Sequence, residues 1–363
     1  MSYFHLNLIL KGKLTVCCLL MLPAIPLNAQ REAKQIGDFK ESISLNEHLR
    51  GTKRTLQYRP DGDEFVCVNG KNRYTRALYG SHSPFRVETS DRPVFAFYNN
   101  GRGGNISFKV ILRDGTELAL DCTGHCESRY SAGKRTYYLT DPSWGKGELR
   151  ISVLALADMD GAIWRFSPSN MPKGAILRWQ HGGATGKRLS RNGDMGVDSA
   201  DCFELPAEAT DLVTGELSLQ KEEYLVRGEV SEGYNVRKLY QQAEAASLVL
   251  ASHLKIETPD PYLNTLGGAL VAAADGIWDG QVWLHGAIGW RMPLSGWRAG
   301  YTGDALGWHD RARTHFDAYA ASQVTDVPNT IPHPAQDSTM NLARSEKRWG
   351  TPQYSNGYIC RNP

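Results

Sequence analysis

The residues best able to do chemistry lie between positions 278 and 319, where aromatic, basic and acidic side chains alternate within a Gly-rich stretch. Five of the nine tryptophans fall here: Trp278, Trp283, Trp290, Trp297 and Trp308. Flat aromatic faces beside charged groups suit a pocket wall that stacks against a polar ring such as a sugar. The alternative is that these tryptophans fill a helical core. The interleaved charges favour the pocket, because an unpaired charge is costly to bury.

Asp304 is the carboxylate in this stretch that we expect to contact a sugar or to act as a catalytic acid. Cleavage of a glycosidic bond generally uses two carboxyl groups, one of which is an acid with a raised pKa. Asp304 stands between Gly303 and a helix expected to begin at Ala305, so its alternative role is to cap that helix. The sequence leaves both roles open.

Neighbouring side chains are expected to contact the same substrate: Trp290, Arg291, Trp297, Arg298, Tyr301, Trp308, His309 and Asp310. The planar guanidinium groups of Arg291 and Arg298 can bind sugar hydroxyls or the carboxylate of a uronate, or they can pair with a nearby aspartate. His309 is equally suited to a structural hydrogen bond. The stretch therefore predicts a saccharide as the partner.

Cysteine spacing does not indicate a metal site. Cys122 and Cys126 stand close to His125, but no second Cys/His pair lies at a useful distance, and zinc takes four protein ligands or three with water. A local disulfide and two free thiols are the other interpretations. A net charge of +2 without a basic cluster argues against nucleic-acid binding. We expect neither a metal nor a cofactor.

The first 29 residues are typical of an export signal. Lys11 and Lys13 precede an apolar run over residues 14–27, and Ala29 supplies the small residue before an expected cut near Gln30. The run is short and interrupted by prolines, which does not favour a membrane-spanning helix. The sequence predicts a periplasmic or secreted protein that has no membrane contact after cleavage.

Short apolar runs separated by turn dipeptides characterise the chain from about residue 59 to residue 228. The dipeptides tolerate positive φ in tight hairpins, and they are Asp61-Gly62, Asn69-Gly70, Asn100-Gly101, Asp114-Gly115 and Asp160-Gly161. We expect strands over residues 64–68, 93–98, 105–112, 135–139, 148–156 and 162–166. Many short strands without intervening helices predict a large sandwich of antiparallel sheets.

After residue 233 the pattern becomes helical. Residues 236–254 lack Gly and Pro, which predicts a linker helix. Asp260 followed by Pro261 predicts the start of a second helix. Its buried face is expected to carry Leu263, Leu266, Leu270, Ala274 and Ile277. A further helix is expected over residues 305–323, with Arg311 on its outer side.

This order of elements resembles the six-hairpin, (α/α)6-barrel glycoside hydrolases that carry an N-terminal β-sandwich. Residues 74–98 and 259–319 are similar to an uncharacterised, exported group of these proteins from polysaccharide-degrading bacteria. Residues 300–304, Gly-Tyr-Thr-Gly-Asp, are similar to the Gly-Trp-Thr-Gly-Asp motif of the α-L-rhamnosidases, which places an acidic side chain in the sugar subsite. This chain departs from the motif at Tyr301, and it lacks acidic residues just upstream, where Ser295, Trp297 and Arg298 stand.

The resemblance implies a multidomain protein with an export signal at residues 1–29, a β-sandwich at 30–233, a linker helix at 234–258 and the first helices of an (α/α)6 toroid at 259–363. It also implies hydrolysis of glycosidic bonds in polysaccharide breakdown. Six helical hairpins need far more chain than the last segment holds. We therefore expect the second carboxylate to lie outside this chain and the chain alone to be inactive. A non-catalytic carbohydrate-binding protein and a polysaccharide lyase are the alternatives.

Overall fold

The computed structural model describes residues 57–80, 82–83, 85–99, 102–182, 212–230, 233–284 and 293–321. The chain divides into two compact units, Met1–Leu56 and Gln57–Pro363, and all the described residues belong to the second. The predicted export signal at residues 1–29 lies outside them. No helix in these ranges is long and apolar enough to cross a membrane.

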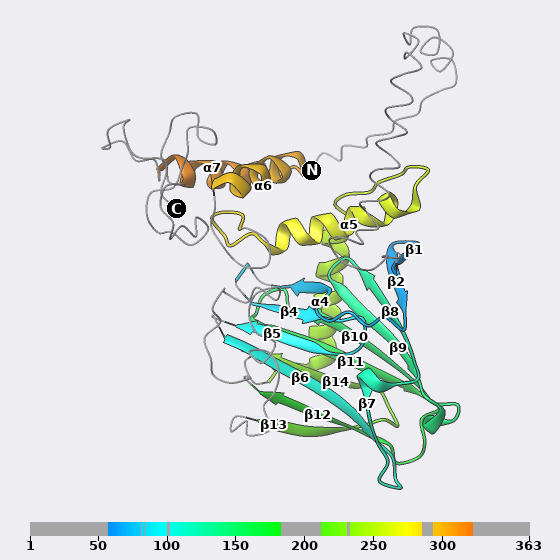
Figure 1. Ribbon diagram of the computed structural model, residues 1–363. Coiled ribbons are helices and arrows are strands. Elements are labelled where there is room, and N and C mark those ends of the chain that lie inside the picture. Colours follow the sequence, from blue (N-terminus) through cyan, green and yellow to red (C-terminus); the bar gives the residue numbers. More distant parts are fainter. Residues whose placement is uncertain are drawn as a thin grey trace, which may run out of the picture. The chain divides into compact units, whose positions relative to one another are not determined.

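Two antiparallel β-sheets make up most of the described structure (Figure 1). The strands are β1 Arg59–Asp61, β2 Glu64–Val68, β3 Arg76–Tyr79, β4 Arg86–Thr89, β5 Phe95–Asn99, β6 Arg102–Ile111, β7 Glu117–Ala119, β8 His125–Ser131, β9 Lys134–Thr140, β10 Glu148–Ala155, β11 Gly161–Ser169, β12 Ile176–Gly182, β13 Val213–Ser218 and β14 Glu223–Gly228. Short 3-10 helices, η1 Leu120–Cys122 and η2 Pro142–Trp144, lie between strands. The first sheet has the order β1-β2-β8-β9-β10-β11-β14. The second has the order β13-β12-β6-β5-β4-β3, with β7 beside β6.

The two sheets pack face to face through alternate residues of their strands. In β6, Ile106, Phe108 and Val110 are buried, as expected for a strand with one face turned to a core. Trp164 of β11 lies within the shared core, and its ring centroid is 5.6 Å from that of Phe95 on the opposite sheet. A core built from the facing sides of two antiparallel sheets is that of a β-sandwich. The sandwich-like arrangement predicted from the sequence is confirmed.

The six predicted strands agree with the structure to within three residues at each end. Gly62 and Gly115 take φ of +61° and +88° in the β1–β2 and β6–β7 turns, which is the backbone conformation that favours glycine. Asp160-Gly161 stands where β10 turns into β11, and the amide of Leu156 donates to the carbonyl of Gly161 at 2.8 Å. The predicted turn at Asn100-Gly101 lies outside the described residues.

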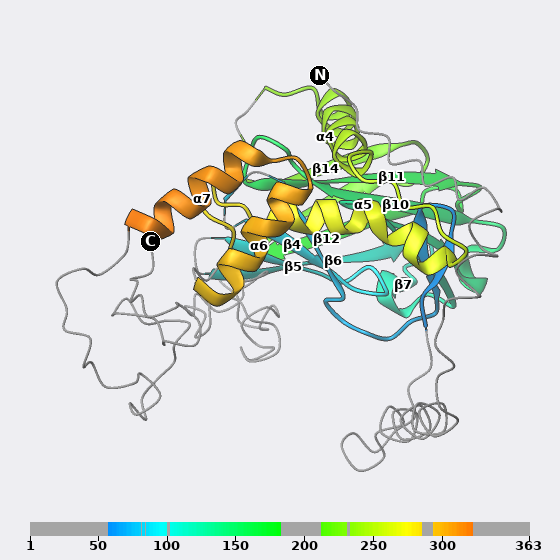
Figure 2. The same ribbon diagram turned by 90° about the horizontal axis from the view of Figure 1, so that it is seen from above.

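Within the described ranges, four helices follow the sandwich: α4 Val236–Ala251, α5 Pro261–Gly276, α6 Pro293–Ala305 and α7 His309–Ala321. Helix α4 contacts β10, β11 and β14 (Figure 1 and Figure 2), where it buries Leu239 and Tyr240 against Ile163. The predicted start of α5 is confirmed. The Asp260 carboxylate accepts a hydrogen bond of 2.8 Å from the backbone amide of Tyr262, and Pro261 is the first residue of the helix.

The predicted buried face of α5 is wrong at two of its five positions. Leu263 and Leu270 are each 47% exposed, and the buried positions are Thr265, Gly267, Val271 and Ala272. The physical reason is close approach through small residues. A Cβ added at Gly267 would lie 2.8 Å from the carbonyl oxygen of Leu254, and one at Gly268 would lie 3.2 Å from Cβ of Ala132. A leucine-rich face could not come so near to these neighbours.

The sequence interpretation also misplaced the last helices. Residues 293–305 form α6, although the prediction left them in a loop, and α7 begins at His309 instead of residue 305. Asp304 therefore lies in the last turn of α6 and does not cap a helix that begins at Ala305. Glycines hid this helix from the sequence. Gly300 and Gly303 lie within it because the rings of Phe316 and Trp283 occupy the space that a Cβ would need.

Candidate functional site

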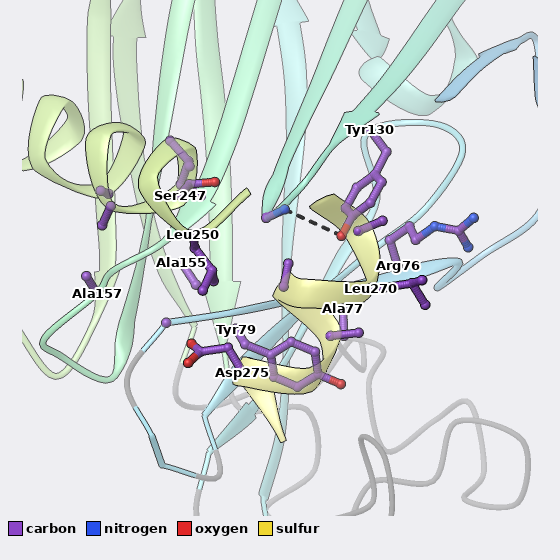
Figure 3. Close-up of a pocket in the computed structure, with 18 of the residues that line it drawn as sticks. Arg76, Ala77, Tyr79, Tyr130, Ala155, Ala157, Ser247, Leu250, Leu270 and Asp275 are labelled. Atoms are coloured by element: carbon purple, nitrogen blue, oxygen red, sulfur yellow. Dashed lines mark hydrogen bonds between the residues drawn. The ribbon is translucent and has the colours of Figure 1, made fainter. Parts of the chain in front are cut away.

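A cleft of about 940 Å³ lies between the sandwich and helices α4 and α5 (Figure 3). Strand β3, the residues after it and the end of β10 form one side, and α4 and α5 form the other. Nine of the residues that line it are alanines. Their small side chains leave room that Leu or Phe would fill, so the elements can be adjacent and still enclose a space for a ligand.

Three tyrosines line the cleft: Tyr74, Tyr79 from β3 and Tyr130 from β8, of which Tyr130 is largely buried. The amide of Gly133 donates to the Tyr130 hydroxyl at 3.4 Å (Figure 3). The Tyr79 ring lies against Gly276, the last residue of α5, where any Cβ would collide with the ring. Burial raises the pKa of Tyr79, so its hydroxyl stays protonated at neutral pH and can donate a hydrogen bond.

A charged cluster ties three elements together at one end of the cleft. The Asp275 carboxylate of α5 lies 3.2 Å from Nε2 of His82, in the segment after β3, and 2.6 Å from a guanidinium nitrogen of Arg311 in α7. Burial raises the pKa of Asp275, but the hydrogen bonds and charges of His82 and Arg311 lower it by more, and the net shift is downward. Asp275 is therefore ionised at neutral pH and orients both partners.

Replacing Asp275 with asparagine should remove part of the acid sensitivity of folding. The folded-state pKa of Asp275 lies below its unfolded value of about 3.9, so the carboxylate stabilises the protein above that pH. This contribution is lost as pH falls through the folded-state pKa. In urea unfolding, Asp275→Asn should be less stable than the unmodified protein near neutral pH, and the difference should narrow toward about pH 3. Asp317→Asn, at an exposed position of α7, is the control. A pH-independent difference would contradict this assignment.

Arg76 of β3 marks another part of the cleft wall. Its guanidinium carbon lies 5.4 Å from the ring centroid of Tyr58 and 5.6 Å from that of Tyr130, and its NH1 group donates to the carbonyl of Thr75 at 2.6 Å. Figure 3 shows Arg76 and Asp275 on opposite sides of Tyr79. Besides the buried Glu88–Arg86 ion pair, the cleft therefore carries charge at two places, Arg76 and the Asp275 cluster, with aromatic and small apolar side chains between them.

The structure places Asp304 away from this cleft. Its side chain is 58% exposed, and its Oδ1 lies 2.6 Å from Nδ1 of His309, the first residue of α7. The pair joins the end of α6 to the start of α7, which is a structural role for His309 of the kind considered from the sequence. Asp304 is not among the residues that line the cleft.

Three of the tryptophans form a core between the helices. Trp278 and Trp283 are buried and lie 4.6 Å apart, and the ring of Trp308 is stacked 6.5 Å from that of Trp283. The indole of Trp283 donates to the carbonyl of Ala274 at 2.9 Å, and its backbone amide donates to Nδ1 of His315. These contacts agree with the alternative interpretation of the sequence, in which the tryptophans fill a core between helices. Of the interleaved charged residues, Arg298, Asp304, His309 and Asp310 avoid burial because they are exposed on α6 and α7.

The other residues predicted to contact a saccharide either lie on the surface or fall outside the described ranges. Arg298, Tyr301 and Asp310 are exposed, and the ring of Tyr301 lies 5.8 Å from that of Phe316. Trp290 and Arg291 lie outside the described residues, as does the side chain of Trp297. The structure brings Trp308, His309 and Asp304 near one another, and none of these three lines the cleft. Arg311, expected on the outer side of its helix, instead reaches Asp275.

The cysteines in the described ranges are free thiols, of which Cys67 and Cys126 are buried and Cys122 is exposed. The interpretation of Cys122 and Cys126 as two free thiols is confirmed, and a disulfide between them is not formed. Within the same part of the chain, no group of three or more His, Cys, Asp or Glu residues converges as metal ligands would.

Sequence reasoning missed the residues that line the cleft. Tyr79 and His82 precede Asp275 by almost two hundred positions, and no short motif links them. Only the run of small residues in α5 could have signalled that another element approaches this helix closely.

Residues 100–244 match a family described as a domain of unknown function, DUF4450. The match covers less than half of the chain and extends from β6 into the first half of α4. No curated protein matches the sequence. The matched segment excludes Arg76, Tyr79, His82 and Asp275, and it includes these cleft residues: Tyr130, Gly133, Leu154, Ala155, Ala157 and Ala243.

Proposed function

We propose that this chain belongs to an exported, glycan-processing protein of the glycoside hydrolase type, and that the cleft between the sandwich and helices α4 and α5 binds a saccharide. Helices α5, α6 and α7 would then be the first helices of an (α/α)6 toroid. The observation that carries the proposal is the cleft itself, about 940 Å³ in volume, with tyrosine surface between two charged places. Such a combination of apolar wall and few polar groups is usual for small-ligand sites.

The chemistry of a sugar fits both kinds of surface. The CH faces of a pyranose ring can lie against the rings of Tyr79 and Tyr130. The ionised carboxylate of Asp275 accepts hydrogen bonds from hydroxyl groups, and Arg311 donates to them. Because His82 and Arg311 already orient Asp275, little side-chain freedom would be lost on binding.

Hydrolysis makes a further demand that the described cleft residues do not meet. One of the two carboxyl groups must be an acid whose pKa is raised, whereas the pKa of Asp275 is lowered. The other carboxylate in the lining, Glu88, is buried in a 2.6 Å ion pair with Arg86. These observations favour saccharide binding by this part of the protein. The assignment of Asp304 as a catalytic residue stays a prediction.

The exposed apolar residues of α5 support the toroid part of the proposal. Tyr262 and Leu263 of α5 are 38% and 47% exposed and do not line the cleft, so they are available to pack against a further helix of a toroid. Helices α6 and α7 are joined by a tight turn, in which the amide of Trp308 donates to the carbonyl of Gly303 at 2.9 Å. A pair of helices joined by a short turn is the repeating unit of a hairpin toroid.

Titration calorimetry of residues 30–363 with neutral and acidic plant and host oligosaccharides tests the proposal. We expect a saccharide that binds the unmodified chain and loses about tenfold or more in affinity in Asp275→Asn, as for loss of a hydrogen bond to a charged group. Asp304→Asn is the matched control and should bind normally. Chromatography of the same mixtures should show no cleavage products. Absence of binding by every saccharide, or loss of binding in Asp304→Asn alone, would overturn the assignment to this cleft.

A further inference from the structure

Arg76 differs from every other charged residue that lines the cleft. Asp275 pairs with His82 and Arg311, and Glu88 pairs with a neighbouring arginine on the same strand. For Arg76 the described residues provide no carboxylate partner, and its recorded contacts are two aromatic rings and one carbonyl oxygen. The cleft therefore contains one cation whose charge has no recorded counter-ion in this part of the chain.

The surroundings of Arg76 hold the guanidinium in place without neutralising it. The rings of Tyr58 and Tyr130 lie 5.4 and 5.6 Å from its central carbon, and one NH group is committed to the carbonyl of Thr75. Cation–π contacts and a single hydrogen bond fix the plane of the group. An arginine fixed in this way presents its remaining N–H donors as a fork, and a fork matches the two oxygens of a carboxylate.

We infer that the cleft accepts an acidic saccharide, in which the carboxylate of a uronic acid residue binds to Arg76. This inference rests on the proposed function and names its substrate class. Figure 3 shows Tyr79 between Arg76 and Asp275, so a second sugar unit would lie near Tyr79 and offer its hydroxyls to the Asp275 cluster. A cation with no carboxylate partner among the described residues selects for a negative charge at one end of the ligand, while the paired cluster at the other end suits neutral hydroxyl groups.

The test compares uronate oligosaccharides with their carboxyl-reduced, neutral counterparts by titration calorimetry on residues 30–363. In the unmodified chain, the uronate form should bind about tenfold or more tightly than the reduced form. Its affinity should fall between about 50 mM and about 500 mM salt, because added ions screen the charge. Arg76→Gln should bring the two forms to equal affinity, and Arg76→Lys should recover part of the difference because it keeps the charge but loses the fork.

Arg150→Gln is the matched control, because this exposed arginine also lies over a tyrosine ring, 5.3 Å from that of Tyr138, and does not line the cleft. It should leave both affinities unchanged. Thermal unfolding of each variant identifies loss of folding, and Arg76→Lys supplies a second test if Arg76→Gln does not fold. Equal binding of both forms by the unmodified chain would overturn the inference and leave saccharide binding intact. If the chain binds a sulfated oligosaccharide more tightly than the uronate, and Arg76→Gln removes this preference, the assignment of a carboxylate as the group bound by Arg76 would be overturned. Binding of neither form, nor of any other saccharide tested, would remove the proposed function as well.

Discussion

Asp91→Ala is expected to lower the free energy of unfolding by about 3–5 kcal/mol, the usual cost of leaving one member of a buried ion pair without the other. The carboxylate is buried and lies 3.6 Å from a guanidinium nitrogen of Arg135, whose side chain is fully buried. It also accepts hydrogen bonds from the hydroxyls of Tyr58 and Thr75 and from the amide of Asn72. Removing it leaves a buried cation and several donors without an acceptor.

Denaturation in urea, followed by fluorescence, measures this loss. Asp317→Ala, at an exposed helix position, should change stability by no more than about 0.5 kcal/mol. The double substitution Asp91→Ala with Arg135→Met should recover stability relative to Asp91→Ala alone, because it removes the stranded charge. If Asp91→Ala unfolds at the same urea concentration as the control, the ion pair does not stabilise the sandwich.

Trp164→Ala is expected to cost about 3–5 kcal/mol, as for other buried tryptophans reduced to alanine. The indole is fully buried in the core shared by the two sheets. Its ring lies edge-on to the rings of Phe95 and Phe97 at centroid distances of 5.6 and 5.7 Å, and 6.2 Å from that of Phe108. Alanine would leave a cavity that these rings, fixed on the facing sheet, cannot fill.

Trp164→Phe is the matched variant, and it should cost less than Trp164→Ala in the same unfolding experiment. Phenylalanine keeps one aromatic ring. It also removes an indole N–H that is buried with no protein partner among the described residues, and such a donor carries a desolvation penalty. Equal losses for the two variants would mean that the aromatic contacts of Trp164 contribute little to stability.

Both predictions concern the scaffold beneath the candidate site. The Asp91 carboxylate bonds to Tyr58 and Thr75, and these two residues also contact Arg76. Trp164 packs between the two sheets that carry the β3 and β10 walls of the cleft. Saccharide affinity measured on the folded fraction of Asp91→Ala should therefore fall together with stability.

Local chemistry determined which parts of this chain form strands, turns and capped helices. Alternating apolar residues specify β6, and Asp-Gly pairs specify its hairpin turn, because side-chain period and positive φ are properties of a few consecutive residues. Asp260 and Pro261 specified the start of α5 for the same reason. The two-layer sandwich followed from the number and spacing of such strands.

The tertiary structure decided which faces are buried and which residues meet. Leucine spacing on α5 predicted burial of Leu263 and Leu270, which are half-exposed, because Gly267 and Gly268 allow a closer approach than leucine does. Tryptophans that resembled a pocket wall pack on one another as a core, while Asp310, Arg313 and Asp317 of α7 are exposed and Arg311 reaches Asp275. The cleft joins Arg76, Tyr79, His82 and Asp275 from separate elements. Because only long-range packing brings these side chains together, no local pattern in the sequence could indicate which residues form the site.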